Sequence, residues 1–174
     1  MTTTYYYTNV FDATYVDWTE VGSSPYLGAI DYPVNYIISV TGASKFEGIW
    51  DFPNSGAENS ETLTGVTVDL YASSVDDKEI GKAGILIWVY DGTSWTALTT
   101  LTPDTTFSWK SKDISSIINT WAKLDACRIY IRTTTALTQS VIVDCMRLTA
   151  TSTPVVAVIP IGGVVQQAKL HDII

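Results

Sequence analysis

Three aromatic residues around one predicted hairpin are the side chains best suited to bind a ligand. Trp88 and Tyr90 alternate along the run ILIWVY, so both lie on one face of a strand. The Asp-Gly pair that follows is typical of a tight turn and returns Trp95 to a position across from them. Flat rings stack on sugar faces, so Trp88, Tyr90 and Trp95 would form a glycan-binding platform. The alternative is cross-strand aromatic pairing that only stabilises the hairpin.

Carboxylates form the second candidate site. Asp12 and Asp17 lie near the first predicted strand, and Asp144 lies in the last one. Calcium takes oxygen ligands from carboxylates and loop carbonyls, so these three residues would hold a structural calcium ion, and no other cofactor is expected. In the alternative, Asp12 and Asp17 are solvated turn residues, and Asp144 faces water between its neighbours Val143 and Cys145.

Groups suited to catalysis are scarce. The one histidine, His171, has no GxSxG element to accompany it, which argues against a hydrolase triad. Glu47 and Asp51 flank Trp50 and are the pair most suggestive of glycoside hydrolysis, but the 18 acidic residues make some such pair inevitable. We therefore expect no catalytic residue and no enzyme.

Charge and apolar length argue against two further classes. The net charge is -8 and no cluster of Lys and Arg is present, which disfavours nucleic acid as a partner. The most apolar stretch, residues 155–165, is shorter than the ~20 residues that cross a bilayer, so we expect no membrane span. The opening residues lack the apolar segment of a signal peptide, and we expect cytoplasmic synthesis without classical secretion.

The elements that position these side chains are predicted to be strands. Only 16% of the residues are charged, and Thr, Tyr, Trp, Val and Ile fit pleated, half-buried surfaces. Val66, Val68 and Leu70 alternate with Thr67 and Asp69, so one face points inward and the other meets water. Similar runs predict strands at residues 15–21, 36–40, 46–52, 63–72, 84–90, 94–101, 105–110, 126–133 and 140–149. The fold class is all-β, an antiparallel two-sheet β-sandwich or jelly roll.

Residues 113–124 break this pattern and predict one short helix. Four apolar residues recur there at helical spacing: Ile114, Ile117, Ile118 and Trp121. Asp113 or Ser115 would cap the helix, and Trp121 would plug the core, because so short a helix needs the sandwich for support. We take this helix to favour the jelly roll over an immunoglobulin-like sandwich.

Cys127 and Cys145 lie in consecutive predicted strands, which we expect to pair as antiparallel neighbours. Their spacing matches no metal motif. A cross-strand disulfide and a pair of buried thiols are both open.

The composition changes after the last predicted strand. We expect a β-sandwich domain over residues 1–150, and a linker with an extended apolar C-terminal arm over residues 151–174. The arm's predicted assembly contacts are Val155, Val156, Val158, Ile159, Ile161, Val164 and Val165. We expect so apolar a run to be buried, either in a groove of its own domain or against a neighbouring subunit. The Thr-Tyr segment at residues 2–7 is expected to pack along a neighbour in the same way.

Residues 109–148 carry a resemblance to a known family. The segment WKSKDISSIINTWAKLDACRIYIRTTT, followed by SVIVDCMRL, resembles the end of jelly-roll domains of the carbohydrate-binding-module or galactose-binding-like kind. Such domains also occur in structural proteins of phages and archaeal viruses. The resemblance implies a structural calcium held by Asp144 with Asp12 or Asp17.

Two functions follow as expectations. The leading one is a non-enzymatic structural protein that assembles through its apolar arm with copies of itself or with a major capsid or other shell protein. It would sit on a virion surface or in another extracellular assembly, for instance as a capsid-decorating protein. The alternative is a glycan-binding module that uses the aromatic platform.

Overall fold

The computed structural model describes residues 1–8, 10–11, 18–21, 30, 36–39, 48–51, 61–74, 84–133 and 141–155. These residues form one short helix and a series of strands. The elements are β1 (Thr2–Tyr7), β2 (Val10–Phe11), β3 (Trp18–Val21), β4 (Tyr36–Ser39), β5 (Gly48–Asp51), β6 (Glu61–Ser74), β7 (Ile85–Tyr90), β8 (Trp95–Ala97), β9 (Ser108–Asp113), α1 (Trp121–Asp125), β10 (Arg128–Thr133) and β11 (Val141–Pro154).

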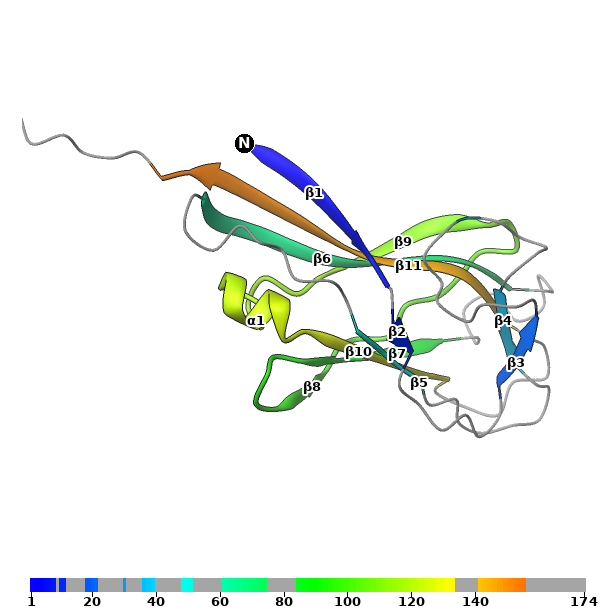
Figure 1. The fold of residues 1–174 in the computed structure, drawn as a ribbon. Coiled ribbons are helices and arrows are strands. Elements are labelled where there is room, and N and C mark those ends of the chain that lie inside the picture. Colours follow the sequence, from blue (N-terminus) through cyan, green and yellow to red (C-terminus); the bar gives the residue numbers. More distant parts are fainter. Residues whose placement is uncertain are drawn as a thin grey trace, which may run out of the picture.

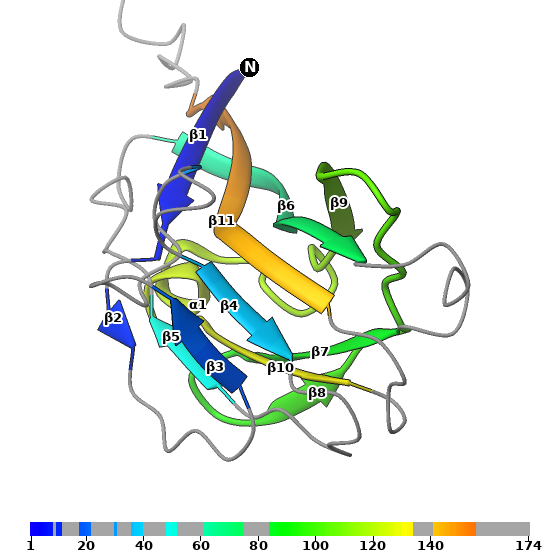
Figure 2. The ribbon, with the colours of Figure 1, turned by 90° about the vertical axis from the view of Figure 1, so that its right-hand side faces the viewer.

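The strands form two antiparallel sheets that face each other (Figures 1 and 2). The β11 sheet has the order β3-β4-β11-β6-β9, with β1 also paired to β11. The β10 sheet has the order β2-β5-β10-β7-β8. The pairs β4/β11, β5/β10, β6/β9 and β7/β8 are therefore nested around the β7–β8 hairpin. An eight-stranded hairpin wound over two sheets in this way is a jelly roll, so the predicted fold class is confirmed.

Alternating residues of both sheets build the core between them. On β6 the predicted inward residues Val66, Val68, Leu70 and Ala72 are buried, as expected. The facing sheet contributes Ile85, Ile87, Val89, Ile129 and Ile131, all fully buried. The outward face of β6 differs from the prediction at Asp69, which is buried at 3% exposure, because neighbouring side chains cover it.

The predicted continuous helix over residues 113–124 is wrong. A turn at Ile114–Ile118 comes first, with the amide of Ile118 donating to the carbonyl of Ile114, and α1 begins only at Trp121. The cap is Thr120, whose hydroxyl accepts from the amide of Lys123. Asp113 instead accepts from Ser115, and Ser115 is bonded to the backbone of Val66, which fastens the turn to β6. Ile114, Ile118 and Trp121 are nevertheless buried in the core.

The two cysteines do not lie on paired strands. β10 pairs with β5 and β7, whereas β11 pairs with β4, β6 and β1, so consecutive strands at the end of the roll belong to opposite sheets. The expected antiparallel pairing of these strands is wrong because the jelly roll crosses between sheets here. Cys127 and Cys145 are both buried thiols rather than a disulfide.

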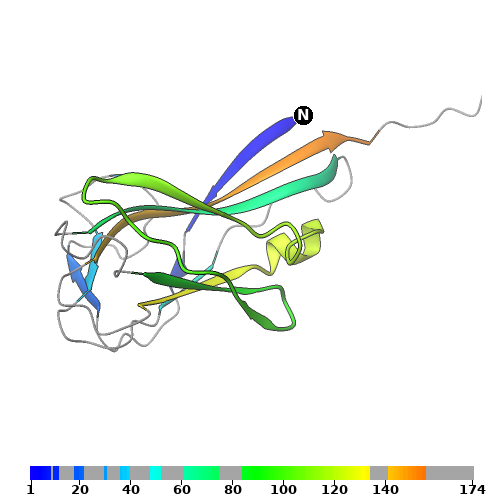
Figure 3. The ribbon, with the colours of Figure 1, turned by 180° about the vertical axis from the view of Figure 1, so that it is seen from behind.

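Two strands of the β11 sheet differ from the prediction, β11 at its C-terminal end and β1 as a whole. β11 continues to Pro154, beyond the predicted end at residue 149, and pairs there with Glu61 of β6. The segment that we expected to pack along a neighbour forms β1, which pairs with β11 of its own chain. Figure 3 shows β1 and the end of β11 projecting on the side of the sandwich where α1 lies. Within the described ranges, no helix is long and apolar enough to cross a membrane.

Candidate functional site

The β7–β8 hairpin positions the predicted aromatic residues. Its turn is closed by Asp91, whose carboxylate accepts from the amides of Thr93 at 3.0 Å and Ser94 at 2.9 Å. Gly92 adopts a φ of +92°, which a side chain would strain. The amide of Ser94, then Lys123 and the amide of Thr93, lower the pKa of Asp91 to about 2. The turn is thus held by a carboxylate that stays ionised at neutral pH.

The predicted residues meet on the outer face of the β10 sheet. In the strand register Tyr90 lies opposite Trp95, and Trp88 lies opposite both Ala97 and Tyr130. The Trp95 ring lies 5.2 Å from that of Tyr90 and 6.2 Å from that of Tyr130, between centroids. Trp88 lies 6.4 Å from Tyr130 in an edge-to-face arrangement. These four residues, which we call the aromatic platform, make one continuous surface across three strands.

Tyr130 is the member of the platform that the sequence analysis missed. It lies in the run RIYIR, in which Ile129 and Ile131 are buried and Tyr130 therefore faces outward. The alternation along this strand is visible in the sequence. The proximity of Tyr130 to Trp88 is not, because β7 and β10 are adjacent only through the nested topology. Trp95 is 38% exposed, while Trp88, Tyr90 and Tyr130 are half-buried. Trp95 is therefore the most exposed member of the platform.

A second aromatic group lies on the outer face of the β11 sheet, around Arg147. The guanidinium carbon lies 3.9 Å from the ring centroid of Trp109 and 4.3 Å from that of Tyr5, so the cation is held between two rings. Tyr71 packs against Trp109 at 5.3 Å and against Phe107 at 5.4 Å. We call these residues the Arg147 cluster. No prediction covered it, because its members come from four strands far apart in the sequence.

Asp69 supplies the countercharge of the Arg147 cluster. Arg147 Nε donates to Asp69 Oδ2 at 3.1 Å, and the hydroxyls of Thr67 and Thr149 also donate to this carboxylate. Burial acts to lower the pKa of Arg147, but its bonds to the Tyr7 hydroxyl and to Asp69 outweigh this and raise the pKa. Asp69 thus neutralises the charge of Arg147, and the two residues form a structural ion pair.

Of the predicted calcium ligands, only Asp144 lies among the described residues. It is 1% exposed, so the alternative that it faces water is wrong. The register of β11 against β6 shifts between Val143 and Cys145, which makes Asp144 the extra residue of a β-bulge. Asp12 and Asp17 lie outside the described residues. Among the described residues no group of three metal-binding side chains occurs, and the calcium site stays a prediction.

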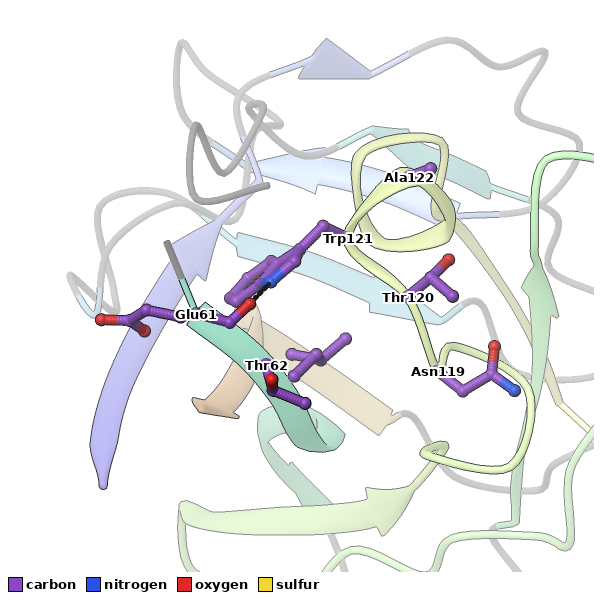
Figure 4. A pocket seen from close by; sticks show the side chains of 7 residues that line it. Glu61, Thr62, Asn119, Thr120, Trp121 and Ala122 are labelled. Carbon is purple, nitrogen blue, oxygen red and sulfur yellow. Dashed lines mark hydrogen bonds between the residues drawn. The ribbon is translucent and has the colours of Figure 1, made fainter. Parts of the chain in front are cut away.

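An open groove lies between the start of β6 and α1 (Figure 4). Its volume is about 420 Å³, and its lining residues are Glu61, Thr62, Leu63, Asn119, Thr120, Trp121 and Ala122. Trp121 is only 8% exposed, and its indole N–H donates to the Glu61 carbonyl at 2.8 Å. Trp121 is therefore part of the core, as predicted, and little of its ring is accessible to a ligand in the groove.

Some of the other predicted residues lie among the described residues, and the rest lie outside them. Asp51 belongs to β5, opposite Arg128 in the register, and Val155 follows β11 at 59% exposure. Glu47, His171 and the arm residues Val156, Val158, Ile159, Ile161, Val164 and Val165 lie outside the described residues.

Comparison with known proteins gives structural likenesses at low identity. No family model matches the sequence, and no curated protein matches it. TmCBM61, solved in complex with β-1,4-galactotriose, is 14% identical with a TM-score of 0.42 over 79% of this chain and 86% of that chain. A family 11 carbohydrate-binding module from Clostridium thermocellum, solved with a β-1,3-1,4-mixed-linked tetrasaccharide, is 13% identical with a TM-score of 0.42 over 84% of this chain and 87% of that one. The jelly roll of this chain is defined by its own strand pairing.

Proposed function

We propose that this protein is a non-enzymatic glycan-binding module that uses the aromatic platform of the β10 sheet. The observation that carries the proposal is the position of Trp95. This ring is exposed, yet it packs against Tyr90 and Tyr130, so its orientation is set before any ligand arrives. A pre-oriented ring loses little freedom on binding, which favours affinity.

Binding would use the apolar faces of a sugar chain. An aromatic ring presents a flat surface of matching polarity, and a row of rings on neighbouring strands spans more than one sugar unit. A rigid sheet supports the platform from below, because Ile87 and Val89 alternate with its members and are fully buried. The mechanism needs no catalytic group and no metal at the platform.

A glycan array followed by calorimetry tests the proposal. Trp95→Ala should weaken binding about tenfold or more, because truncating an aromatic anchor costs at least about 1–2 kcal/mol at a binding surface. Trp95→Tyr keeps a flat ring and should retain most of the affinity. Tyr130→Ala should weaken binding as well, through the lost support of Trp95.

The matched control is Tyr71→Ala, which removes an aromatic side chain from the outer face of the opposite sheet. This variant should bind as the unchanged protein does. If no glycan is bound at all, or if Trp95→Ala binds as tightly as the parent, the platform is not a glycan site.

A structural protein of a virion or similar shell is the second candidate function. The observation that favours it is Val155, an apolar residue 59% exposed where the described chain leaves β11. In this hypothesis the arm packs on a neighbour and removes that surface from water. Deleting residues 156–174 leaves the β11–β6 pairing complete, so a loss of assembly, measured by light scattering, would support the arm, and unchanged assembly would refute it.

A further inference from the structure

Among the strands that the structure describes, none pairs with the outer edge of β1. Within the described part of the chain β1 has one neighbouring strand, β11, and it pairs there from Thr2 opposite Ser152 to Tyr7 opposite Arg147. The opposite edge of β1 faces no described strand. This edge lies on the sheet that does not carry the aromatic platform, so pairing at this edge is independent of glycan binding.

One hydrogen bond just beyond the end of β1 shows which of its residues direct their backbone N–H and C=O groups towards β11. The amide of Thr8 donates to the carbonyl of Met146 at 3.5 Å, so Thr8 points towards β11. Backbone groups alternate in direction along an antiparallel strand. Thr4 and Tyr6 therefore also point towards β11, and Thr3, Tyr5 and Tyr7 present their N–H and C=O groups to the open edge.

This edge lacks the features that keep sheet edges apart. Natural edge strands carry charged residues, proline or bulges that prevent pairing with another chain. β1 has the sequence TTTYYY, which contains none of the charged residues or prolines, and its six-residue register with β11 has no bulge. Threonine and tyrosine both favour strands. In a chain of net charge -8, this segment presents no like charge to a copy of itself.

The edge is also ordered in advance by the Arg147 cluster. Tyr6 is buried at 9% exposure, and Arg147 contacts the Tyr5 ring and the Tyr7 hydroxyl. Tyr5 and Tyr7 nevertheless remain 50% and 38% exposed. β1 is thus held in strand conformation, two of its tyrosines are exposed and no described strand pairs with its outer edge, so pairing costs little further ordering.

We propose that β1 pairs with β1 of a second copy in antiparallel fashion, which joins two β11 sheets into one across a two-fold axis. Opposite residues must both point to the open edge, so an axis at Tyr5 places Thr3 opposite Tyr7 of the second copy and Tyr5 opposite its counterpart. The first of these pairs a β-branched residue with an aromatic one and the second pairs two aromatic residues, and both kinds of cross-strand pair stabilise neighbouring strands. A two-fold axis makes the contact closed, so it yields a dimer rather than a fibre. One strand pair is a small interface, and the dimer is expected to dissociate on dilution.

Sedimentation velocity over a wide range of concentration tests the proposal, with Thr3→Pro as the principal variant. Proline removes an N–H that points to the open edge and leaves the ladder to β11 intact. The dissociation constant of the dimer should rise about tenfold or more, because each dimer loses two inter-strand hydrogen bonds. Thr3→Lys, which places a charge on this edge, should have the same effect. Thr100→Lys adds the same charge at an exposed loop position and should leave the dimer unchanged.

Two further variants separate the explanations. Thr4→Pro removes an N–H that points towards β11, so it should lower the thermal unfolding temperature, whereas Thr3→Pro should not. Deleting residues 156–174 should leave the dimer intact. A monomer at every concentration overturns the proposal, as does a dimer that Thr3→Pro and Thr3→Lys leave unchanged. A dimer lost only on deleting residues 156–174 would assign the contact to the arm instead.

Discussion

Replacing Arg147 with methionine should destabilise the protein far more than its location on an outer sheet face suggests. The Arg147 and Asp69 side chains are 19% and 5% exposed, so the pair is largely removed from water. Methionine keeps an apolar stem between the Trp109 and Tyr5 rings but removes the charge. Asp69 then remains as a buried carboxylate without its cation.

The expected loss of stability is the sum of two contributions. Removing one partner of a buried ion pair costs about 3–5 kcal/mol, and the lower end applies because the Thr67 and Thr149 hydroxyls still donate to Asp69. Loss of the cation between two rings adds about 1 kcal/mol. The free energy of unfolding should therefore fall by about 4 kcal/mol, which urea denaturation at neutral pH measures.

Lys110→Met is the matched control for this experiment. It makes the same type of substitution in the Lys110–Asp104 pair, which is also short at 2.6 Å but has side chains 27% and 55% exposed. An exposed pair contributes little, so this variant should lose less than about 1 kcal/mol. If Arg147→Met loses no more than Lys110→Met, the assignment of Arg147 as a buried structural cation is incorrect.

Three further substitutions test the turn, the core and the acid response. Gly92→Ala should cost about 1–2 kcal/mol in chemical denaturation, because it forces a positive φ on alanine and brings its Cβ within 3.0 Å of the Ala126 Cβ; an unchanged midpoint would contradict the turn geometry. Trp121→Phe should cost about 1 kcal/mol by losing the bond to the Glu61 carbonyl, and a variant as stable as the parent would show that this bond is not made. Asp91→Asn should flatten the loss of stability in acid: the lowered pKa of Asp91 means that its contribution is complete above the ordinary value of 3.8 and is lost as pH falls towards about 2. If the unfolding free energies of the parent and of Asp91→Asn decline in parallel through this pH range, the proposed role of Asp91 is refuted.

Local patterns predicted the parts of the fold that local contacts build. The Asp91-Gly92 turn and the alternation on β6 and β7 depend on adjacent residues, and both are seen in the structure. β1 was missed as a strand of this chain because TTTYYY has no alternation between polar and apolar residues. The helix was overestimated because the bonds of Ser115 to Val66, made across a long sequence separation, hold the preceding segment in a turn.

The binding surfaces show the same division. Trp88, Tyr90 and Trp95 share one hairpin, so their proximity followed from the turn, but Tyr130 joins them only because β10 lies beside β7. The Arg147 cluster depends on β1, β6, β9 and β11 meeting in one sheet. Only knowledge of the strand order would have revealed it.

The strand order also governs when this domain can fold during synthesis. β11 is the last described strand, yet it lies in the interior of its sheet, between β6 on one side and β4 and β1 on the other. Until residues 141–154 have left the ribosome, β6 and β4 have no common partner, and the β11 sheet lacks its central strand. Sheets that depend on such distant pairing form slowly and expose aggregation-prone edges meanwhile. A nascent chain stalled before β11 should therefore be sensitive to protease and bind chaperones, and release of the last strand should end both.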